Sequence, residues 1–523
     1  MISGAGVRLD NISGAWDIIV AGGGITGAGV LREAVRMGLR ALLVEKNDFA
    51  WGTSSRSSKL VHGGLRYLKQ GSLHLTWESV RHRQRLLAEA PGLVEPIGFL
   101  MPVYSKKGPG RWSLEAGLTL YDLMAGRRYH RYYGADAFSE LVPGLDKEGL
   151  CGGFGFMDAQ VDDARLVLRL IDESVQKGAA ALNYTSVTEI RRNERGEVTG
   201  ASVEDTRTGQ TRFFSAPVVI NATGSWAETL HASPDSGLHL RPLRGSHLML
   251  PSWRLPVYQA VTLIHPDDGR PLFIIPWEGA LMLGTTDIDH GHGLEGEIVM
   301  DKHEALYMIE CLKAYFPGQD LGLKDCVSSY SGIRPVLSKG NKPPSQESRE
   351  HVVWKDKGLV TVTGGKLTTF RVLAKDALKA ASDRLPGKPE PGTSDPVFDP
   401  PGPLPEKRRG LSTGTWRRLL GRYGQMAGQM VMGAEKKDLS FIPGTLTLWA
   451  ELPVAAQTGQ IRHLTDLMLR RVRPGILLSE GGRTHLDRVE ALCRPVLDWD
   501  EKRWAAERRM YMEYWDYVHS VPL

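Results

Sequence analysis

The sequence predicts an α/β fold that joins a parallel sheet to an antiparallel sheet and a helical C-terminal domain. A buried strand, a glycine-rich turn and a helix follow one another at residues 16–36. Two apolar runs at 271–277 and 280–284 flank Glu278-Gly279, a pattern typical of a β-hairpin. Helical apolar patterns appear near the C-terminus, at 460–472 and 483–497.

The size and composition of the chain exclude several classes of protein. A chain of 523 residues is too long for one core, so two or three domains are expected. The net charge of +5 is modest and basic runs are short, which disfavours a nucleic-acid partner. The four cysteines lack metal-ligand spacing, so no metal site is expected, and sparse cysteine fits a reducing compartment. Without a signal peptide or a spanning apolar run, a cytoplasmic protein follows, either soluble or attached to a membrane surface.

The glycine-rich turn at residues 22–27 has the spacing of a Rossmann dinucleotide site. Gly22 permits the tight turn, Gly24 lets the backbone approach a pyrophosphate, and Gly27 allows close packing of the helix. A second strand at 41–44 ends at Glu45, where a carboxylate can accept hydrogen bonds from a ribose. The order of these parts favours a dinucleotide site over a purely structural turn, but it does not distinguish FAD from NAD.

The next segment, TSSRSSKLVHGGLRYL at 53–68, closely resembles the FAD-dependent glycerol-3-phosphate dehydrogenases, which belong to the D-amino-acid-oxidase-like flavoprotein superfamily. Further matching segments are DDARL at 162–166, NATG at 221–224, GSH at 245–247, GTTD at 284–287, SGIRP at 331–335 and GGKLTT at 364–369. The resemblance covers residues 14 to about 385 well and the remainder more loosely.

The resemblance implies three domains, built from alternating segments. The Rossmann-like FAD-binding domain is expected at 14–95, 151–235 and 326–385. The cap, an α+β substrate domain with an antiparallel sheet, is expected at 96–150 and 236–325. Clustered prolines predict an extended linker at 386–406, followed by a helical C-terminal domain at 407–523.

FAD is the cofactor that the resemblance implies. In the resembling enzymes the Ser/Thr-rich loop wraps the pyrophosphate and flavin, although a solvated loop is the plainer alternative. The glycine turn before Lys366 leads into a helix whose N-terminus can stabilise negative charge on reduced flavin. The implied cofactor residues are Gly22, Gly24, Ile25, Thr26, Gly27, Glu45, Lys46, Thr53, Ser54, Ser55, Ser58, Lys59, His62, Gly63, Gly64, Ala222, Gly224, Gly365, Lys366, Leu367 and Thr368.

The resemblance also implies oxidation of sn-glycerol 3-phosphate to dihydroxyacetone phosphate by hydride transfer to FAD. Arg66 and Arg334 are candidates to bind the phosphate, since guanidinium groups bind phosphate in bidentate fashion; surface ion pairs are the alternative. Tyr67 can add a hydroxyl or be a core aromatic. His247 and Lys366 complete the substrate site and, with Arg334, the candidate catalytic set. Either His247 or Lys366 can take the proton, while Lys366 can instead bind the substrate.

The resembling dehydrogenases pass electrons to membrane quinone at the inner face of the cell membrane. Residues 106–112 join cations to a tryptophan, a mixture found at headgroup level, and 114–120 can enter the interface; a solvated loop and core helix are the alternative. A homodimer is compatible with the sequence. The cluster Arg470, Arg471 and Arg473 can face the membrane or the cofactor domain, and a solvated face is the default expectation.

Three other functions remain open. The related oxidase uses O₂ and releases H₂O₂, but the chain lacks the long cap insertion that such oxidases tend to carry. Another polyol phosphate is possible as substrate. A non-catalytic flavin-binding protein is disfavoured, because Arg66, His247, Arg334 and Lys366 are all present.

Overall fold

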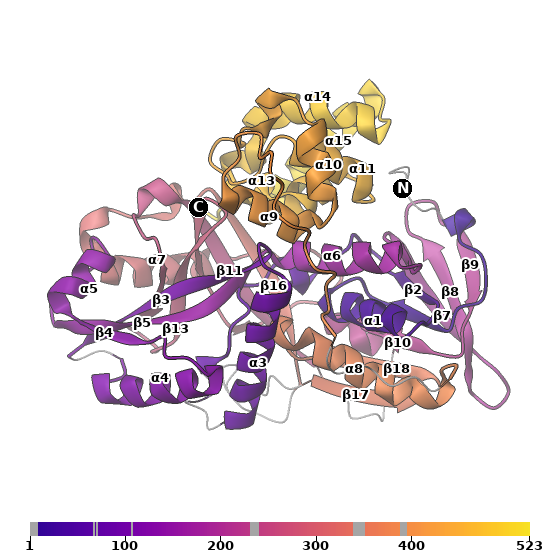
Figure 1. Ribbon diagram of the computed structural model, residues 1–523, viewed down its shortest axis with the longest axis horizontal. Coiled ribbons are helices and arrows are strands. Elements are labelled where there is room, and N and C mark those ends of the chain that lie inside the picture. Colours follow the sequence, from indigo (N-terminus) through magenta and orange to yellow (C-terminus); the bar gives the residue numbers. More distant parts are fainter. Residues whose placement is uncertain are drawn as a thin grey trace.

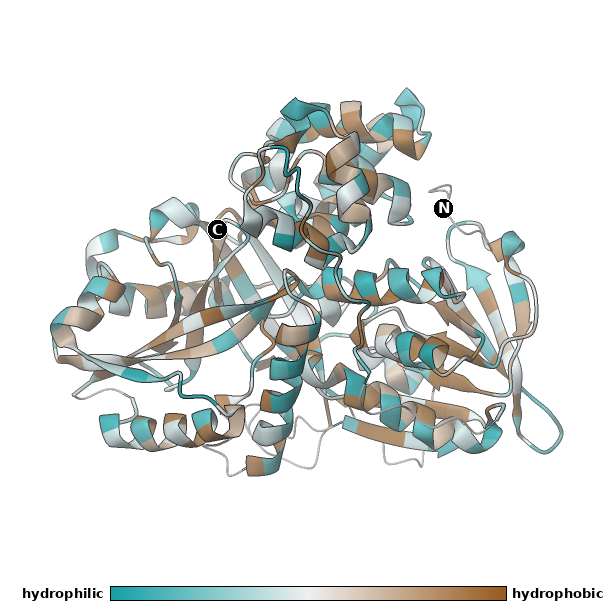
Figure 2. Cartoon of the chain, in the orientation of Figure 1, coloured by the Kyte–Doolittle hydropathy of each residue, from teal (hydrophilic) through white to brown (hydrophobic). Residues whose placement is uncertain are grey.

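The computed structural model describes residues 9–65, 68, 72–105, 108–230, 240–337, 351–387 and 395–523. Two sheets lie side by side, and the helical C-terminal domain lies over both (Figure 1). Brown, apolar residues are concentrated in the strands, whereas the helices carry teal residues on their outer faces (Figure 2). This distribution is that of elements that bury one face against a common core.

The first sheet has the strand order β17-β18-β10-β1-β2-β6, parallel except for β17. All residues of β1 and β2 are buried, because helices cover both faces of a parallel sheet. Its strands are β1 (Ile18–Ala21), β2 (Ala41–Val44), β6 (Ala180–Leu182), β10 (Val219–Asn221), β17 (His351–Asp356) and β18 (Leu359–Gly364). Its helices are α1 (Ile25–Arg36), α6 (Asp163–Gln176) and α8 (Phe370–Ala381).

The second sheet forms the cap and has the order β15-β11-β14-β13-β12-β3-β5-β4, with β16 also paired to β11. It is antiparallel apart from the β12–β3 pair. Its strands are β3 (Val94–Tyr104), β4 (Arg131–Gly134), β5 (Leu150–Val161), β11 (Leu240–Pro251), β12 (Ala260–Ile264), β13 (Pro271–Trp277), β14 (Ala280–Gly284), β15 (Ile288–Asp289) and β16 (Ser328–Leu337). The helices beside it are α3 (Leu73–Glu89), α4 (Arg111–Ala125), α5 (Ala135–Leu141) and α7 (Lys302–Tyr315).

The predicted hairpin is present as β13 and β14. Glu278 and Gly279 connect the two strands with φ values of +52° and +95°, as a tight hairpin turn requires. A smaller antiparallel sheet consists of β7 (Thr185–Arg192), β8 (Val198–Asp205) and β9 (Thr211–Ser215).

The C-terminal domain is helical and shares its core with the cap. Trp277 and Met282 of the cap belong to the same buried cluster as Trp449 and Trp504. Its helices are α9 (Thr413–Tyr423), α10 (Met426–Gly433), α11 (Glu451–Thr458), α12 (Leu464–Asp466), α13 (Pro474–Leu477), α14 (Leu486–Leu497) and α15 (Glu501–Val518), with a π-helical turn at Leu467–Arg471.

Short 3₁₀ turns join these elements. They are η1 (Leu9–Asn11), η2 (Thr53–Ser55), η3 (Gly224–Leu230), η4 (Ser252–Arg254), η5 (Pro317–Gln319), η6 (Leu323–Asp325), η8 (Leu367–Thr369), η9 (Ser382–Arg384), η10 (Lys436–Leu439) and η12 (Ser479–His485).

The structure differs from four sequence expectations. Strands β5 and β16 extend the cap sheet, although 151–161 and 326–337 were assigned to the FAD-binding domain. The expected helix at 460–472 is broken into α12 and the π-helical turn. Part of the linker packs closely, since Val397 and Phe398 are buried. Arg470, Arg471 and Arg473 are also buried, so the expectation of a solvated face is wrong.

Candidate active site

A cavity of about 1910 Å³ lies at the carboxyl ends of the parallel strands, where the cap meets them. Ala21, Val44, Ala222 and Gly364, each at or just beyond the end of such a strand, line it. Ligands of open α/β sheets bind at this edge. The cap closes the other side with both polar and apolar side chains.

The glycine turn has no room for side chains. A Cβ at Gly22, where φ is +113°, would lie 2.5 Å from the Ala222 carbonyl oxygen. A Cβ at Gly27 would lie 1.9 Å from the Gly22 carbonyl oxygen, so Gly27 packs α1 against the turn and does not itself line the cavity. The Ile25 N–H donates to Ser54 Oγ at 2.9 Å, which joins the helix start to the Ser/Thr-rich loop. The N-terminus of α1 therefore faces the cavity as a site for anionic phosphate.

Glu45 lines the cavity and also holds the turn. Its Oε2 accepts the Gly23 N–H at 2.6 Å and its Oε1 accepts the Asn47 N–H at 2.9 Å. Burial raises the pKa of Glu45, while these two N–H donors oppose the rise. The Lys46 ammonium lies 4.8 Å from the centre of the Trp226 ring, which also lines the cavity.

The Ser/Thr-rich loop divides its side chains between the cavity and the protein interior. Thr53, Ser54 and Ser58 line the cavity, whereas Ser55 and Lys59 do not. The Lys59 ammonium is buried and lies 2.8 Å from Asp163 Oδ2 and 2.6 Å from the Ser55 carbonyl oxygen. The Lys59 side chain thus holds the loop from its buried side, and the expected contact of Lys59 and Ser55 with the cofactor stays a prediction.

His247 is also behind the wall of the cavity. Its Nε2 lies 2.9 Å from Ser58 Oγ, and its ring stacks on Tyr330 with centroids 4.7 Å apart. His247 is not among the residues that line the cavity, and its expected contact with substrate stays a prediction. Burial, with Lys59 and Arg334 nearby, lowers the pKa of His247 well below its usual range.

His62 and Lys366 line the cavity on two adjoining segments. Thr368 Oγ1 donates to the His62 carbonyl oxygen at 3.3 Å, which joins the two segments. The Lys366 ammonium donates to Ser79 Oγ at 3.2 Å. Gly63 lies outside the lining; its N–H donates to Asp158 Oδ1 at 3.1 Å.

Three of the matching motifs meet on adjacent cap strands. In the β11–β14 and β11–β16 registers, His247 is opposite both Gly284 and Tyr330. Arg334 lines the cavity and donates to Thr285 Oγ1 at 2.9 Å and to Asp287 Oδ1 at 3.1 Å. A Cβ at Gly245 would lie 2.3 Å from this guanidinium, so the glycine makes room for it.

The structure brings most of the expected site residues to one cavity. Those lining it are Gly22, Gly24, Ile25, Thr26, Glu45, Lys46, Thr53, Ser54, Ser58, His62, Gly64, Ala222, Gly224, Arg334, Gly365, Lys366, Leu367 and Thr368. Five expected site residues are not part of the lining: Gly27, Ser55, Lys59, Gly63 and His247. Arg66 and Tyr67 lie outside the described residues.

Several lining residues were not singled out from the sequence. Arg56 lies inside the matched loop and donates to Glu297 Oε2 at 2.9 Å. Arg270 donates to the Asp287 carbonyl oxygen at 2.7 Å, near Arg334. Trp226 directly follows the matched NATG segment and Ser225. Arg56 lies inside a matching motif and Trp226 lies close to one, so both could have been indicated by the sequence. Nothing in the sequence around Arg270 indicated a place in the site.

The site fits a dinucleotide with a flavin. Its lining includes both the glycine turn and the Lys366 segment, and each of these leads into a helical N-terminus. Ser225 Oγ lines the cavity and, among the described residues, is a buried hydroxyl without a hydrogen-bond partner. A buried polar atom of this kind calls for a ligand or water. Lys366 and the turn that follows it would face the flavin of FAD, where a helical N-terminus can stabilise the negative charge of the reduced ring.

Comparison with known families gives two matches along the chain. Residues 17–375 match the family described as FAD dependent oxidoreductase. Residues 367–504 match the C-terminal domain of alpha-glycerophosphate oxidase.

Individual relatives match over most of the chain. An aerobic glycerol-3-phosphate dehydrogenase of Staphylococcus haemolyticus (strain JCSC1435) is 32% identical, over 87% of this chain and 86% of the relative. That of Staphylococcus aureus (strain MRSA252) is 35% identical, over 71% of this chain and 67% of the relative.

Two solved structures share the fold. The glycerol-3-phosphate dehydrogenase from Bacillus halodurans, complexed with FAD, has a TM-score of 0.77 at 26% identity, covering 97% of this chain and 96% of that one. The L-alpha-glycerophosphate oxidase from Mycoplasma pneumoniae, with FAD bound, has a TM-score of 0.59 at 18% identity. It covers 75% of this chain and 100% of that one, and at this identity it supports the fold alone.

Proposed function

The chain belongs to the family of FAD-dependent glycerol-3-phosphate dehydrogenases, and from this membership we propose that it oxidises sn-glycerol 3-phosphate to dihydroxyacetone phosphate and passes the electrons to a membrane quinone. One observation carries the proposal. A single cavity joins the glycine turn that fits FAD to two cationic side chains, Arg334 and Lys366.

The positive charges of Arg334 and Lys366 support a phosphorylated substrate. Arg334 is held in place by Thr285 and Asp287, so its guanidinium is oriented before substrate arrives. A preoriented guanidinium can bind a phosphate in bidentate fashion, and Lys366 supplies a second positive charge. Arg66 stays a prediction for the same role.

Bound FAD would supply the acceptor for a hydride from the substrate carbon. The chain must then accept the hydroxyl proton, and we assign this role to His62 in place of His247. His62 lines the cavity, whereas Ser58 separates His247 from it. The depressed pKa of His247 also makes it a weak proton acceptor. Lys366 then binds the substrate oxygen or phosphate.

The apolar end of the cavity supports a quinone as electron acceptor. Its lining includes Phe99, Met101 and Phe273 of the cap sheet with Leu114 and Leu118 of α4. An apolar lobe continuous with the flavin site can admit the ring of a quinone and exclude water. These two leucines belong to α4, for which the sequence left a membrane surface and a core helix as alternatives.

The outer faces of α3 and α4 support attachment to a membrane. Trp112 is 77% exposed and Leu123 72% exposed on α4, and Leu73 and Trp77 are exposed on α3. In Figure 1, α4 lies along the lower edge of the molecule, and one end of α3 reaches that edge. Exposed tryptophan and leucine together are typical of interfacial helices. Within the described residues, no helix is long and apolar enough to span a membrane.

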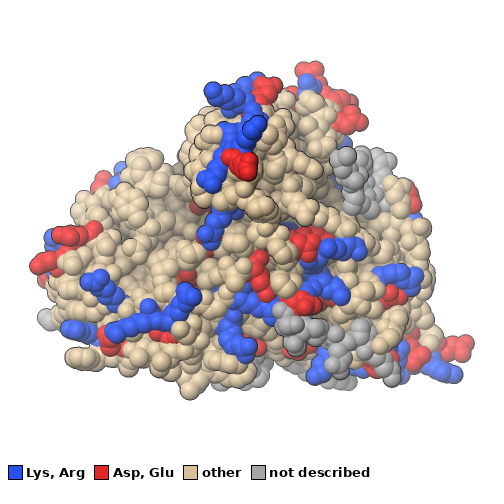
Figure 3. All heavy atoms as spheres, in the orientation of Figure 1, with Lys and Arg blue, Asp and Glu red and all other residues tan. Residues whose placement is uncertain are grey.

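On the face seen in Figure 3, Lys and Arg gather over the C-terminal domain and along the lower part of the cap. Basic and acidic side chains are interspersed over the parallel-sheet domain. Lys106 and Lys107, which were expected to contribute to membrane contact, lie outside the described residues. A homodimer stays a prediction.

Substituting both exposed α4 residues in W112S/L123S is expected to abolish most binding to vesicles containing anionic lipid, because it removes the apolar side chains that would enter the interface. Cosedimentation measures the bound fraction. W253S is the matched control, since Trp253 is 80% exposed on η4. Equal binding by the double variant and the wild type would contradict the membrane proposal.

Anaerobic addition of glycerol 3-phosphate to the FAD-loaded protein is expected to bleach the flavin absorbance. A short-chain quinone should then restore the absorbance faster than air does. Failure to bleach with FAD bound would overturn the dehydrogenase proposal. Fast reoxidation by air with stoichiometric H₂O₂ would favour the oxidase, and bleaching by another polyol phosphate alone would change the substrate.

A further inference from the structure

One segment of the C-terminal domain places three buried arginines against the FAD-binding domain. The side chains of Arg470, Arg471 and Arg473 are 5%, 0% and 2% exposed. They lie on or just after the π-helical turn Leu467–Arg471. Among the described residues, those that line the cavity all precede Phe370. The C-terminal domain therefore approaches the site without entering it.

Arg470 and Arg471 bind the loop at the ribose end of the site. The Arg471 Nη2 donates to Asp48 Oδ1 at 2.6 Å, and the Arg470 Nε donates to Asp48 Oδ2 at 2.5 Å. Asp48 is three residues beyond Glu45, and its side chain is fully buried. Burial opposes its ionisation, but the two guanidiniums hold the pKa of Asp48 well below its usual range.

The Asp48 loop wraps the glycine turn. The Ala50 N–H donates to the Gly23 carbonyl oxygen at 3.0 Å, and the Glu45 carboxylate accepts the Gly23 N–H. Asp48 Oδ1 also accepts the Asn183 amide at 2.9 Å, two residues before the cavity-lining Thr185. Anchoring Asp48 therefore restrains the surroundings of the ADP half of FAD.

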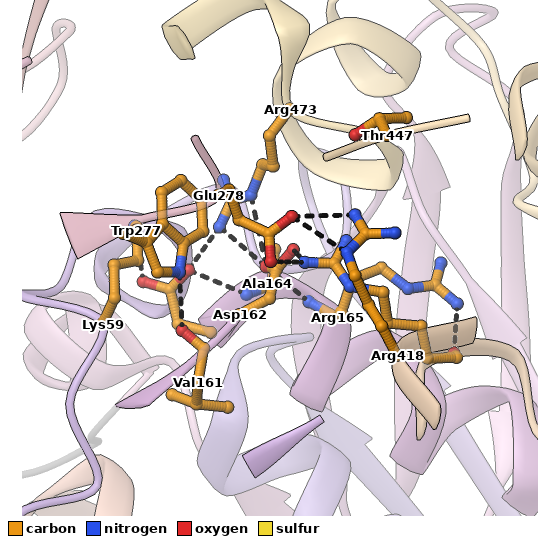
Figure 4. A network of polar contacts seen from close by, with 12 residues as sticks. Lys59, Val161, Asp162, Ala164, Arg165, Trp277, Glu278, Arg418, Thr447 and Arg473 are labelled. Atoms are coloured by element: carbon orange, nitrogen blue, oxygen red, sulfur yellow. Dashed lines mark hydrogen bonds and ion pairs between the residues drawn. The ribbon is translucent and has the colours of Figure 1, made fainter. Parts of the chain in front are cut away.

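Arg473 binds the helix start behind the flavin end. It donates to Asp162 Oδ1 at 3.1 Å (Figure 4). It also contacts Asp163 Oδ1. The other oxygen, Asp163 Oδ2, accepts the Ser57 hydroxyl at 2.7 Å and the Lys59 ammonium at 2.8 Å. Ser57 and Lys59 flank Ser58, which lines the cavity. Arg473 is thus connected to the flavin loop through one carboxylate.

The buried carboxylates of Asp48 and Asp163 depend on Arg471 and Arg473 to offset the free-energy cost of burying negative charge. Desolvating an ion costs several kcal/mol, and removing one partner of a buried pair leaves the other uncompensated. Without Arg471, Asp48 would keep Arg470 as its buried cation, and without Arg473, Asp163 would keep Lys59. Each carboxylate would then be only partly compensated and would draw in water or rearrange, so that the loop that it holds would loosen. A loosened loop binds the cofactor less well, because ordering it again costs free energy on binding.

We propose that Arg471 and Arg473 are positioning residues for FAD, through which the C-terminal domain holds the two ends of the cofactor site. Arg471 acts through Asp48 on the ADP half, and Arg473 acts through Asp163 on the flavin half. The C-terminal domain is therefore part of the cofactor site although it supplies none of its lining among the described residues.

The test measures cofactor affinity without turnover. Apoprotein of R471M and R473M is titrated with FAD, followed by flavin fluorescence, and ADP is used as a competitor that occupies one half of the site. The control is R418M. Arg418 belongs to the same domain and pairs with Glu278 of the cap hairpin (Figure 4) and with Glu451. Among the described residues, it contacts neither Asp48 nor Asp163, and it is linked to Asp162 only through Glu278 and Arg422. Thermal unfolding of all three variants is recorded.

Both R471M and R473M are expected to raise the Kd for FAD by about tenfold or more, equivalent to at least ~1.4 kcal/mol. R471M should weaken ADP equally, whereas R473M should leave ADP within about twofold of the wild type. R418M should lower the melting temperature but leave both Kd values within about twofold.

The proposal is overturned if the Kd for FAD is unchanged in R471M and R473M. It is also overturned if R418M raises the Kd for FAD as much as R471M and R473M do, with the same loss of melting temperature. Weaker packing of the C-terminal domain on the rest of the protein would then explain the effect. If R471M does not fold, R471K is titrated with FAD and ADP in its place. It keeps the charge but loses the bidentate geometry, so a smaller rise in the Kd for FAD and ADP is expected, and no rise would count against the proposal.

Discussion

Replacing His62 by Asn is expected to slow reduction of FAD by glycerol 3-phosphate by about 10²–10⁴-fold, the usual contribution of a positioned general base. The expectation follows from placement, since His62 lines the cavity beside the Lys366 segment. Asparagine keeps a polar side chain of similar reach but accepts no proton at neutral pH. Stopped-flow absorbance under anaerobic conditions measures the rate constant at saturating substrate.

H247N is the comparison that separates the two histidines. His247 reaches the cavity through Ser58 alone among the described contacts, and its imidazole is buried against Tyr330. We expect this variant to lose stability while its reduction rate stays within about tenfold of the wild type. The opposite order of effects, with H247N slower than H62N and FAD bound in both, would return the base assignment to His247.

Replacing Arg334 by Ala is expected to lower kcat/KM for glycerol 3-phosphate by ~30- to 1000-fold, or about 2–4 kcal/mol, because it removes a charged phosphate contact. The loss should appear mainly in KM, since the phosphate is held alike before and during hydride transfer. Truncation also leaves the largely buried Asp287 without this partner, which adds unfavourable negative charge to the site. Steady-state kinetics with a quinone acceptor measure both constants.

Two controls test whether the effect concerns the phosphate. Arg254 belongs to the same domain with a similar exposure, 20% against 23%, and pairs with Asp325 outside the cavity. R254A should leave kcat/KM unchanged. Glycerol lacks the phosphate, so its slow oxidation should be equal in R334A and the wild type. An unchanged KM for glycerol 3-phosphate in R334A would rule out the phosphate role.

The fold class and the cofactor were both predictable from the sequence, and the comparisons confirm them. The glycine turns could be recognised because their requirement is local. No side chain fits at Gly22 or Gly27, whatever the rest of the chain does. The hairpin at Glu278-Gly279 and the buried strands β1 and β2 followed from local pattern for the same reason.

The roles of individual polar residues were less predictable, because they depend on partners far away in the sequence. Lys59 was expected beside the cofactor, yet its ammonium is drawn to Asp163. His247 was expected at the substrate, yet strand register places it behind Ser58. The domain boundaries also differ from those expected, since β5 and β16 pair with cap strands that are distant in the sequence.

By itself, then, the sequence determined the dinucleotide turn, the family resemblance with its cofactor, and the set of residues from which the site is built. Only the tertiary structure decided which of them face the cavity. It placed His62 there and His247 behind it, and it buried Arg471 and Arg473 against Asp48 and Asp163. The physical reason is that backbone geometry follows from neighbouring residues, whereas burial and charge pairing depend on which distant segments meet.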